Sequence, residues 1–184
     1  TVKLENFMEK TPAFKKIVDQ LHPATRQLIT GISGSARALL LATLQEKQSR
    51  PLLVVTDNMA HMQELADDLG GLVGEERVYQ FPVEEVLAAE VATSSPNYRL
   101  QRVQALAALG QGDSAIVVTS AAGLRRNVVS PQFFAQATLK VKTGGELDPE
   151  KARDQLSAMG YQLQKMVLRP GDFAVRGSII DIYA

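Results

Sequence analysis

The sequence lacks cysteine and long apolar runs, and each absence excludes a class of protein. No cysteine occurs among the 184 residues, which excludes disulfides, thiolate metal sites and cysteine nucleophiles and fits a reducing cytoplasm. The longest wholly apolar runs, such as residues 52–55, fall far short of the ~20 residues that span a bilayer. No signal-peptide pattern opens the chain. We therefore expect a cytoplasmic protein with no membrane partner.

The chain also has no surplus of charge, since 20 basic residues balance 20 acidic ones. Binding to nucleic acid requires a local surplus of Lys and Arg, so we expect DNA to bind weakly if at all. The charge is unevenly placed, because residues 1–50 carry a net +4 and residues 51–100 a net −7. His22 and His61 lack the spacing of metal ligands, and we expect no metal site.

Over the first two thirds of the chain, short continuous apolar runs alternate with apolar residues at helical spacing. The predicted strands are residues 28–29, 52–55, 78–81 and 116–119, and the predicted helices include residues 14–21, 40–44, 59–69 and 100–110. Strands separated by such helices require right-handed crossovers. The pattern predicts an α/β fold with a mostly parallel sheet and helices on both faces. A solvated acidic face is our interpretation of three carboxylates after the third strand, Glu84, Glu85 and Glu90.

A different pattern follows Pro131. Alternating residues predict a strand at 139–143, and Asp148 followed by Pro149 is typical of a helix start, with the helix ending at Gly160. Residues 161–168 and 173–183 are predicted to form a hairpin around a turn at 169–172. A bulge near Gly177 would turn four apolar residues inward and leave two charged residues outward: Phe173, Val175, Ile180 and Ile182 inward, Arg176 and Asp181 outward.

This second pattern predicts a small α+β domain. We place the boundary near residues 125–135 and assign residues 1–130 to the α/β domain and residues 131–184 to the α+β domain. The second domain is expected to be incomplete, because the chain stops directly after an apolar strand.

One segment lies where a phosphate-binding Walker A loop, G-x-x-x-x-G-K-[ST], would lie between a strand and a helix. A working loop needs a second glycine for close approach to phosphate, a lysine for the β and γ phosphates, and a hydroxyl for Mg²⁺. Ala38 offers the metal no oxygen, and we expect no productive ATP binding, no cofactor and no catalysis. A small-residue turn without nucleotide history is the alternative. The residues of this segment are Gly31, Gly34, Ala36, Arg37 and Ala38, with alanine at the second motif glycine and arginine at the motif lysine.

The segment from Pro170 to Tyr183 reads PGDFAVRGSIIDIY. It resembles the signature G-[DE]-F-x-[VTI]-R-G-x-[ILV]-[ILV]-D-[IL]-[FY] of the excision-repair protein UvrB and the bacterial transcription-repair coupling factors (Mfd). Residues 81–82, 94–96 and 129–134 resemble the coupling factors in the same order, so the resemblance covers nearly the whole chain. UvrB keeps an intact Walker A loop and an aromatic-rich hairpin that this chain lacks. The departures favour the coupling factor family.

The resemblance implies the N-terminal, UvrB-like module of a bacterial protein that recognises stalled RNA polymerase, displaces it and recruits UvrA in transcription-coupled nucleotide excision repair. It implies a degenerate P-loop, RecA-like domain over residues 1–130 and the start of a UvrA-interaction domain over residues 131–184. The polymerase-binding domain and the ATP-dependent motor of the family would lie further along the chain. Arg176 aligns with an arginine of the docking surface in UvrB, and three neighbours on the predicted hairpin are added as candidates: Lys165, Arg169 and Phe173.

Two alternatives remain open at this point. The first is an active P-loop ATPase fragment, which measurable affinity for Mg-ATP would support. The second is a DNA-binding module that uses the basic first quarter together with Arg125 and Arg126 as a phosphate track.

Overall fold

The computed structural model describes residues 8–48, 50–83, 96–111 and 114–183. It divides into two compact units, unit 1 over residues 1–127 and unit 2 over residues 128–184. The three carboxylates interpreted as a solvated acidic face, Glu84, Glu85 and Glu90, lie outside the described residues. Among the helices that the structure describes, none is both long and apolar enough to cross a membrane.

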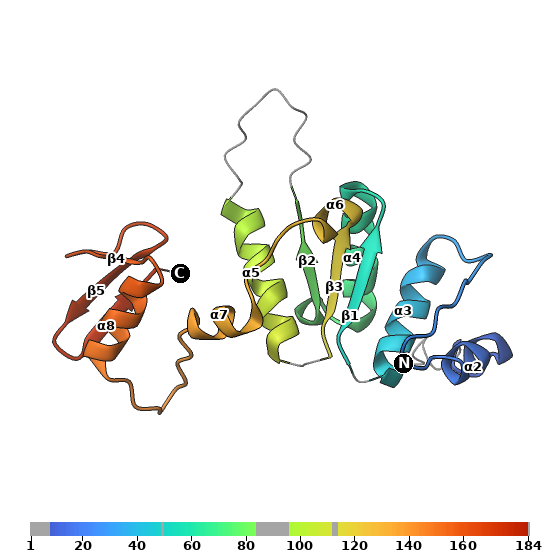
Figure 1. The fold of residues 1–184 in the computed structure, drawn as a ribbon, viewed down its shortest axis with the longest axis horizontal. Helices are drawn as coiled ribbons and strands as arrows, with labels where there is room; N and C mark the ends of the chain where they lie inside the picture. The colour runs from blue at the N-terminus through green and yellow to red at the C-terminus, as the bar shows by residue number, and fades with distance from the viewer. Residues whose placement is uncertain (1–7, 49, 84–95, 112–113, 184) are drawn as a thin grey trace, which may run out of the picture. The chain divides into compact units, whose positions relative to one another are not determined.

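Unit 1 is built on a parallel sheet of three strands (Figure 1). The strands are β1 (Leu52–Thr56), β2 (Val78–Phe81) and β3 (Ile116–Ser120), in the order β1-β3-β2. β3 is central and buried along its whole length, as its continuous apolar run predicts. Both β1 and β2 pair with β3 in parallel, so the prediction of a parallel sheet is confirmed.

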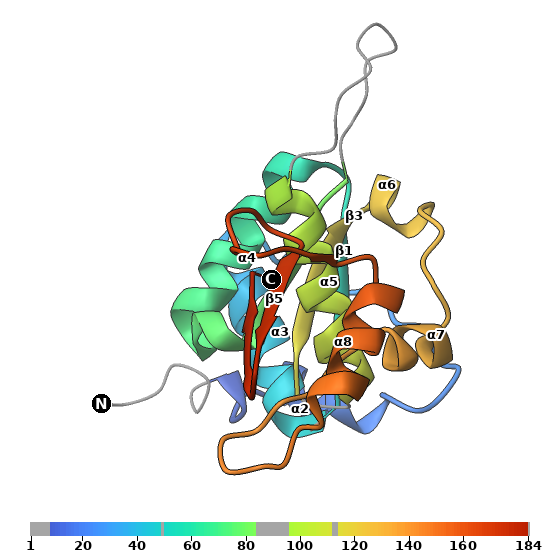
Figure 2. The same ribbon diagram turned by 90° about the vertical axis from the view of Figure 1, so that its left-hand side faces the viewer.

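Helices cover both faces of this sheet, as predicted (Figures 1 and 2). α4 (Met59–Val73) connects β1 to β2, and α5 (Pro96–Gln111) lies between β2 and β3 in the chain. The two crossovers run in opposite directions across the sheet, so right-handed connections put the two helices on opposite faces. α3 (Ser35–Gln48) and α4 pack on the face of Val54, Ile116 and Val118, whereas α5 packs on the face of Tyr79, Phe81 and Val117.

The first helix of unit 1 forms as its spacing predicts, but the strand predicted after it does not. α2 (Pro12–Asp19) begins after Thr11, whose Oγ1 accepts a hydrogen bond from the Phe14 N–H at 3.3 Å. Residues 28–29 are not a strand, and Leu28 is 90% exposed. β1 and β2 occupy the two edges of β3, so residues 28–29 cannot pair with this central strand of the described sheet.

α4 is longer than the helix predicted at residues 59–69. The helix continues through Gly70 and Gly71 to Val73. Gly70 is buried, and an added Cβ there would lie 3.4 Å from Glu75 Cγ. The helix ends at Gly74, whose φ of 98° leaves the helical region. Two short helices follow elsewhere in unit 1, η1 (Glu75–Arg77) and α6 (Ala121–Leu124).

Unit 2 contains two helices and a sheet of three strands. α7 (Pro131–Gln136) and α8 (Pro149–Ala158) each begin with a capping residue followed by proline. The predicted cap of α8 is confirmed, since Asp148 Oδ1 accepts hydrogen bonds from the N–H groups of Glu150 (3.0 Å) and Lys151 (3.3 Å). The sheet has the order β4-β5-β6, with β4 (Gln162–Leu163), β5 (Asp172–Arg176) and β6 (Ile179–Ile182). Its core contains Ala152, Leu156 and Phe173.

The predicted hairpin of unit 2 is misplaced. Residues 161–168 contribute only the two residues of β4, and these pair with β5 in parallel. The antiparallel hairpin is instead formed by β5 and β6, with Gly177 and Ser178 as its two-residue loop. Gly177 has a φ of 62°, a conformation that favours glycine and that tight hairpin loops require. A turn therefore replaces the predicted bulge.

The strand predicted at residues 139–143 is also wrong. These residues form no strand, and Val141 is 60% exposed. Alternation of apolar and polar residues gives a segment a strand pattern, but a strand forms only where another strand offers hydrogen bonds. In the part of the chain that the structure describes, no strand pairs with this segment.

Candidate functional site

The β5–β6 hairpin separates its side chains into an inner and an outer face. Residues paired across two strands project to the same side, and the inner side pairs Phe173 with Ile182 and Val175 with Ile180. The four apolar side chains predicted to point inward therefore share one face, on which Phe173 is fully buried but Ile182 is exposed. The outer face carries Ala174, Arg176, Ile179 and Asp181; Arg176 and Ile179 are exposed there, whereas Ala174 is buried.

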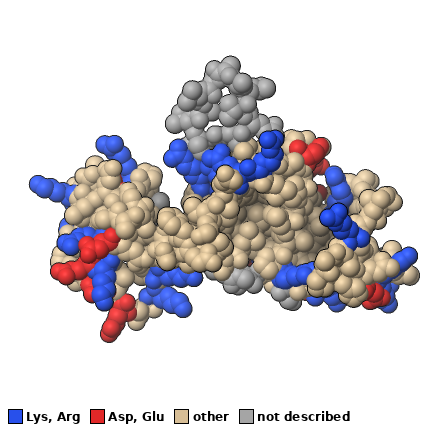
Figure 3. Space-filling model, in the orientation of Figure 1, with Lys and Arg blue, Asp and Glu red and all other residues tan. Residues whose placement is uncertain are grey.

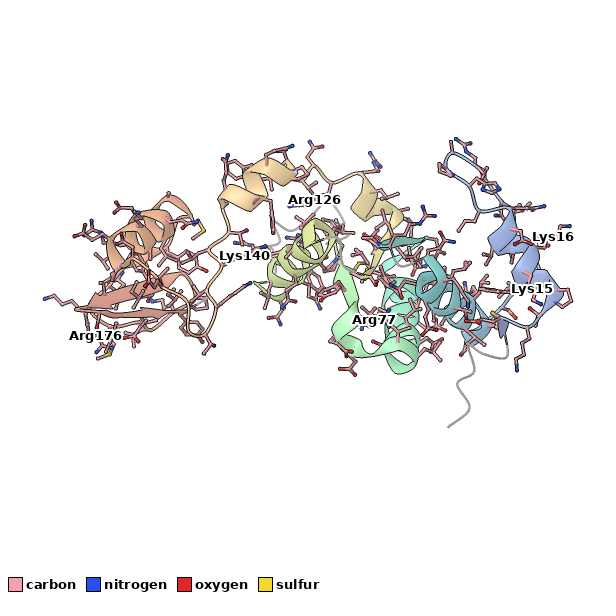
Figure 4. The ribbon with its side chains drawn as sticks, turned by 90° about the horizontal axis from the view of Figure 1, so that it is seen from below. Lys15, Lys16, Arg77, Arg126, Lys140 and Arg176 are labelled. Atoms are coloured by element: carbon pink, nitrogen blue, oxygen red, sulfur yellow. The ribbon has the colours of Figure 1, made fainter. Side chains whose placement is uncertain are left out.

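Arg176 lies at the end of β5 on the outer face (Figure 4). Its Nη2 donates a hydrogen bond to Asp181 Oδ2 on the neighbouring strand, and 68% of the Arg176 side chain is exposed. An exposed ion pair contributes ~0–1 kcal/mol, so this pair orients the guanidinium without holding it tightly. The planar guanidinium can bind a carboxylate by two parallel hydrogen bonds, which makes Arg176 able to receive an acidic group from a partner.

Asp172 fixes the loop that leads into β5. Its side chain is 9% exposed, and its Oδ2 accepts hydrogen bonds from the N–H groups of Leu168 (3.2 Å) and Arg169 (3.0 Å). A buried carboxylate with backbone donors of this kind holds a loop in one conformation. Asp172 was not among the predicted site residues, although aspartate after Pro-Gly is a common signal of such local hydrogen bonding.

The structure separates two of the basic residues that the sequence analysis grouped. The Arg169 backbone lies at the start of β5, where it bonds Asp172, whereas Arg176 ends the strand. Four residue steps along a strand span about 13 Å. Lys165 follows Gln164, whose N–H donates to the Phe173 carbonyl at 2.8 Å, so the chain next to Lys165 lies beside the first residues of β5. Both Arg169 and Lys165 are exposed.

Phe173 requires a correction. This residue was predicted to contact a partner, but its side chain is 0% exposed. Its burial on β5, the central strand of the second sheet, makes it part of the core of unit 2. We therefore remove Phe173 from the contact residues.

A hollow borders the outer face at the other side of β5. Gln162 pairs in register with Asp172 and so projects to the same side of the sheet as Ala174 and Arg176. A cavity of about 420 Å³ opens there between β4 and the loop that follows it. Polar and exposed apolar side chains line it, including Gln162, Gln164, Met166, Leu168 and Arg169. We call this hollow together with the outer face of the hairpin the docking face.

The segment compared with a Walker A loop forms a turn, with Gly31 and Gly34, that leads into the first residues of α3, where Ala36, Arg37 and Ala38 lie. Gly31 and Gly34 have φ values of 79° and 55°, and an added Cβ at either position would meet no atom within 4 Å. Ala38 lies on the buried side of α3 and belongs to the core, so the position of the motif hydroxyl faces the protein interior. Ala36 and Arg37 are exposed.

The cavity next to this turn carries mostly negative charge. It has a volume of about 380 Å³, and Arg37 lines it together with three carboxylates, Asp57, Glu64 and Asp68. His61 Nδ1 lies 2.6 Å from Asp57 Oδ1, and this hydrogen bond lowers the pKa of Asp57 below its ordinary value, so the carboxylate stays ionised. Such walls repel a polyphosphate. Within the described ranges no three metal-ligating side chains gather as an ion would require.

Comparison with known proteins adds to this geometry. Residues 139–184, which include the docking face, match the family model described as "UvrB interaction domain". Over 181 residues the chain is 33% identical to the transcription-repair-coupling factor of Bacillus subtilis, a match that covers 98% of this chain and 15% of that protein. It is 28% identical over 180 residues to the protein of the same name from Staphylococcus epidermidis, with the same two coverages, 98% and 15%.

A third relative, the transcription-repair-coupling factor of Staphylococcus aureus, is 28% identical over 166 residues, or 90% of this chain and 14% of that protein. The chain therefore spans about 15% of the length of the relatives it matches. The signature from Pro170 to Tyr183 forms the loop end, strands and turn of the docking face. The chain belongs to the transcription-repair coupling factor family and corresponds to the N-terminal, UvrB-like module of those proteins.

Proposed function

We propose that this chain recruits the excision-repair protein UvrA, through the docking face of unit 2, to lesions where RNA polymerase has stalled. The observation that carries the proposal is the exposed, weakly held Arg176 on the outer face of a hairpin that lies within the match to the UvrB interaction domain. Acidic groups of UvrA would bind the guanidinium in place of Asp181. The polymerase-binding and motor functions belong to the remainder of the coupling factor.

We further propose that the chain itself is not an enzyme and holds no nucleotide. Ala38 offers no oxygen for Mg²⁺, and three carboxylates line the cavity beside the turn. These features speak against the active ATPase fragment. A calorimetric titration with Mg-ATP checks this part of the proposal, and binding tighter than ~1 mM would contradict it.

The docking proposal is tested by binding of the 184-residue chain to purified UvrA. Truncating an arginine that is buried and paired in a complex costs ~2 kcal/mol or more, so Arg176→Ala is expected to weaken binding by about 30-fold or more. The matched control is Arg153→Ala on α8, which also removes an arginine paired with a surface carboxylate, Asp154. The control is expected to leave the affinity within about twofold. Equal affinities of Arg176→Ala and the unchanged chain, with both folded, would reject the proposal.

A second variant separates docking from a structural role of Arg176. Asp181→Asn removes the charge that competes for the guanidinium, so the affinity for UvrA should stay unchanged or rise by up to about fivefold. If Asp181→Asn instead weakened binding as strongly as Arg176→Ala, the ion pair itself would be the required feature, and the exchange of partners that we propose would be wrong.

A further inference from the structure

The charges of unit 1 are segregated along its sequence. Six acidic residues and no Lys or Arg occur between residues 57 and 76: Asp57, Glu64, Asp67, Asp68, Glu75 and Glu76. Residues 96–127 carry the opposite charge, with four arginines and a single acidic residue, Asp113, which lies outside the described residues. The neutral net charge of the chain hides this separation.

The fold turns this separation along the sequence into two surfaces. The acidic stretch forms α4 and the turns at its two ends, on one face of the sheet. The basic stretch contains α5, which packs on the opposite face. α6 lies on the α5 side, because a Cβ at Gly123 would meet the side chain of Thr119, and Thr119 has the same strand parity as Val117. The α4 layer of unit 1 is therefore acidic, and the α5 layer on the opposite face of the sheet is basic.

The arginines of the basic face converge where β2 and β3 end. Arg102 Nη1 donates to the Pro82 carbonyl at 3.0 Å, just beyond the end of β2. Arg99 lies one turn earlier on α5, on the same side of the helix. A hollow opens beside α6, and its lining consists of Val83, which follows Pro82, with Ala122, Arg125, Arg126 and Asn127. Figure 3 shows Lys and Arg side chains gathered at this end of the sheet.

Three of these arginines are available to a ligand. Arg99, Arg125 and Arg126 are exposed, and none of them has an ion-pair partner in the part of the chain that the structure describes. Arg102 has interactions within the protein and helps to position α5 against β2. We call Arg99, Arg125 and Arg126 the arginine patch.

We propose that the arginine patch binds the phosphate backbone of nucleic acid. Guanidinium groups bind phosphate by two hydrogen bonds, and a phosphodiester backbone presents negative charges at close, regular intervals. An acidic protein segment is the less favoured ligand, because the apolar part of the hollow is small, consisting of Val83 and Ala122, and lacks the large anchor pocket of protein hot spots. The proposal is independent of UvrA docking, which concerns unit 2.

The test is fluorescence anisotropy of the 184-residue chain with a labelled duplex DNA of arbitrary sequence. Three phosphate contacts predict that the binding constant falls about 40-fold when salt is raised from ~50 to ~200 mM. The double variant Arg125→Ala/Arg126→Ala keeps one contact, so its affinity should be lower at ~50 mM salt and fall only about threefold over the same range. Circular dichroism confirms that the variant is folded.

The matched control is Lys15→Ala/Lys16→Ala. It removes the same charge from an exposed site of unit 1, on α2, well apart from Arg126 in Figure 4. The control should keep the steep salt dependence of the unchanged chain. Three outcomes would overturn the proposal: no salt-dependent DNA binding, equal losses in both double variants, or a loss of polyglutamate binding without any loss of DNA binding in the arginine variant.

Discussion

The contact between α6 and β3 gives a sharp test of the packing that positions Arg125 and Arg126. Gly123 in α6 is buried against β3, and a Cβ added there would lie 2.0 Å from Thr119 Oγ1. This hydroxyl is itself buried and donates to the Phe81 carbonyl at 2.8 Å. Gly123→Ala must therefore either displace the hydroxyl from its hydrogen bond or push α6 away from the sheet.

The two ways of relieving the clash have similar costs. Loss of the hydrogen bond leaves a buried carbonyl without its donor, which costs ~1–3 kcal/mol. Movement of α6 is overpacking, which also costs ~1–3 kcal/mol. Alanine has the better helix propensity and returns up to about 1 kcal/mol. We expect Gly123→Ala to lower the free energy of unfolding of unit 1 by ~1–2 kcal/mol.

Urea denaturation followed by circular dichroism measures this effect, with hydrogen exchange of β3 peptides assigning it to unit 1. The control is Gly71→Ala in α4, where an added Cβ meets no atom within 4 Å, so the variant should gain ~0.5–1 kcal/mol. In a Thr119→Ala background the nearest contact of the new Cβ becomes about 3.4 Å, so Gly123→Ala should cost little there. If Gly123→Ala stabilised the chain as much as Gly71→Ala does, the predicted clash between α6 and Thr119 would be wrong.

Two further predictions concern polar groups of unit 1. Gln45 is 1% exposed; its side chain donates a hydrogen bond to the Ser114 carbonyl and accepts one from Arg77 Nη2 at 2.5 Å. Gln45→Leu should therefore lower the free energy of unfolding measured in urea by ~1–3 kcal/mol. The control, Gln63→Leu at an exposed position, should have little effect. His61→Ala should raise the pKa of Asp57 in an NMR titration, because the His61 hydrogen bond lowers it. The lowered pKa means that this stabilisation is present at neutral pH and is lost as the pH falls through the pKa of Asp57 in the folded protein. An unchanged Asp57 pKa in His61→Ala would contradict that cause.

Local patterns of sequence determined the α/β character of unit 1. The apolar runs of β1 and β3 are each long enough for one buried strand, and helical spacing between them leaves no room for a tight hairpin, so parallel pairing follows. The start of α8 could also be predicted from the sequence. Asp148 accepts hydrogen bonds from N–H groups of the first turn, and Pro149 has no N–H that needs a partner, so this helix start depends on local residues alone. The signature around Arg176 indicated the family to which the chain belongs.

Strand pairing depended on information that the local sequence does not contain. The pattern of residues 139–143 resembles a strand but finds no partner, and the pattern of residues 161–168 yields two parallel residues in place of a hairpin arm. A strand is stabilised by hydrogen bonds to another segment, so its existence and direction depend on the whole unit. The strand predicted at residues 28–29 was wrong for the same reason.

The candidate sites show the same division. Sequence alone identified Arg176 and the opposite charges of residues 51–100 and of the arginine pair at 125–126. Only the tertiary structure decided that Phe173 is core, that Arg169 and Arg176 mark opposite ends of β5, and that the acidic and basic stretches cover opposite faces of one sheet. The physical reason is that composition fixes which charges a chain carries, whereas the direction of each crossover fixes the face on which they lie.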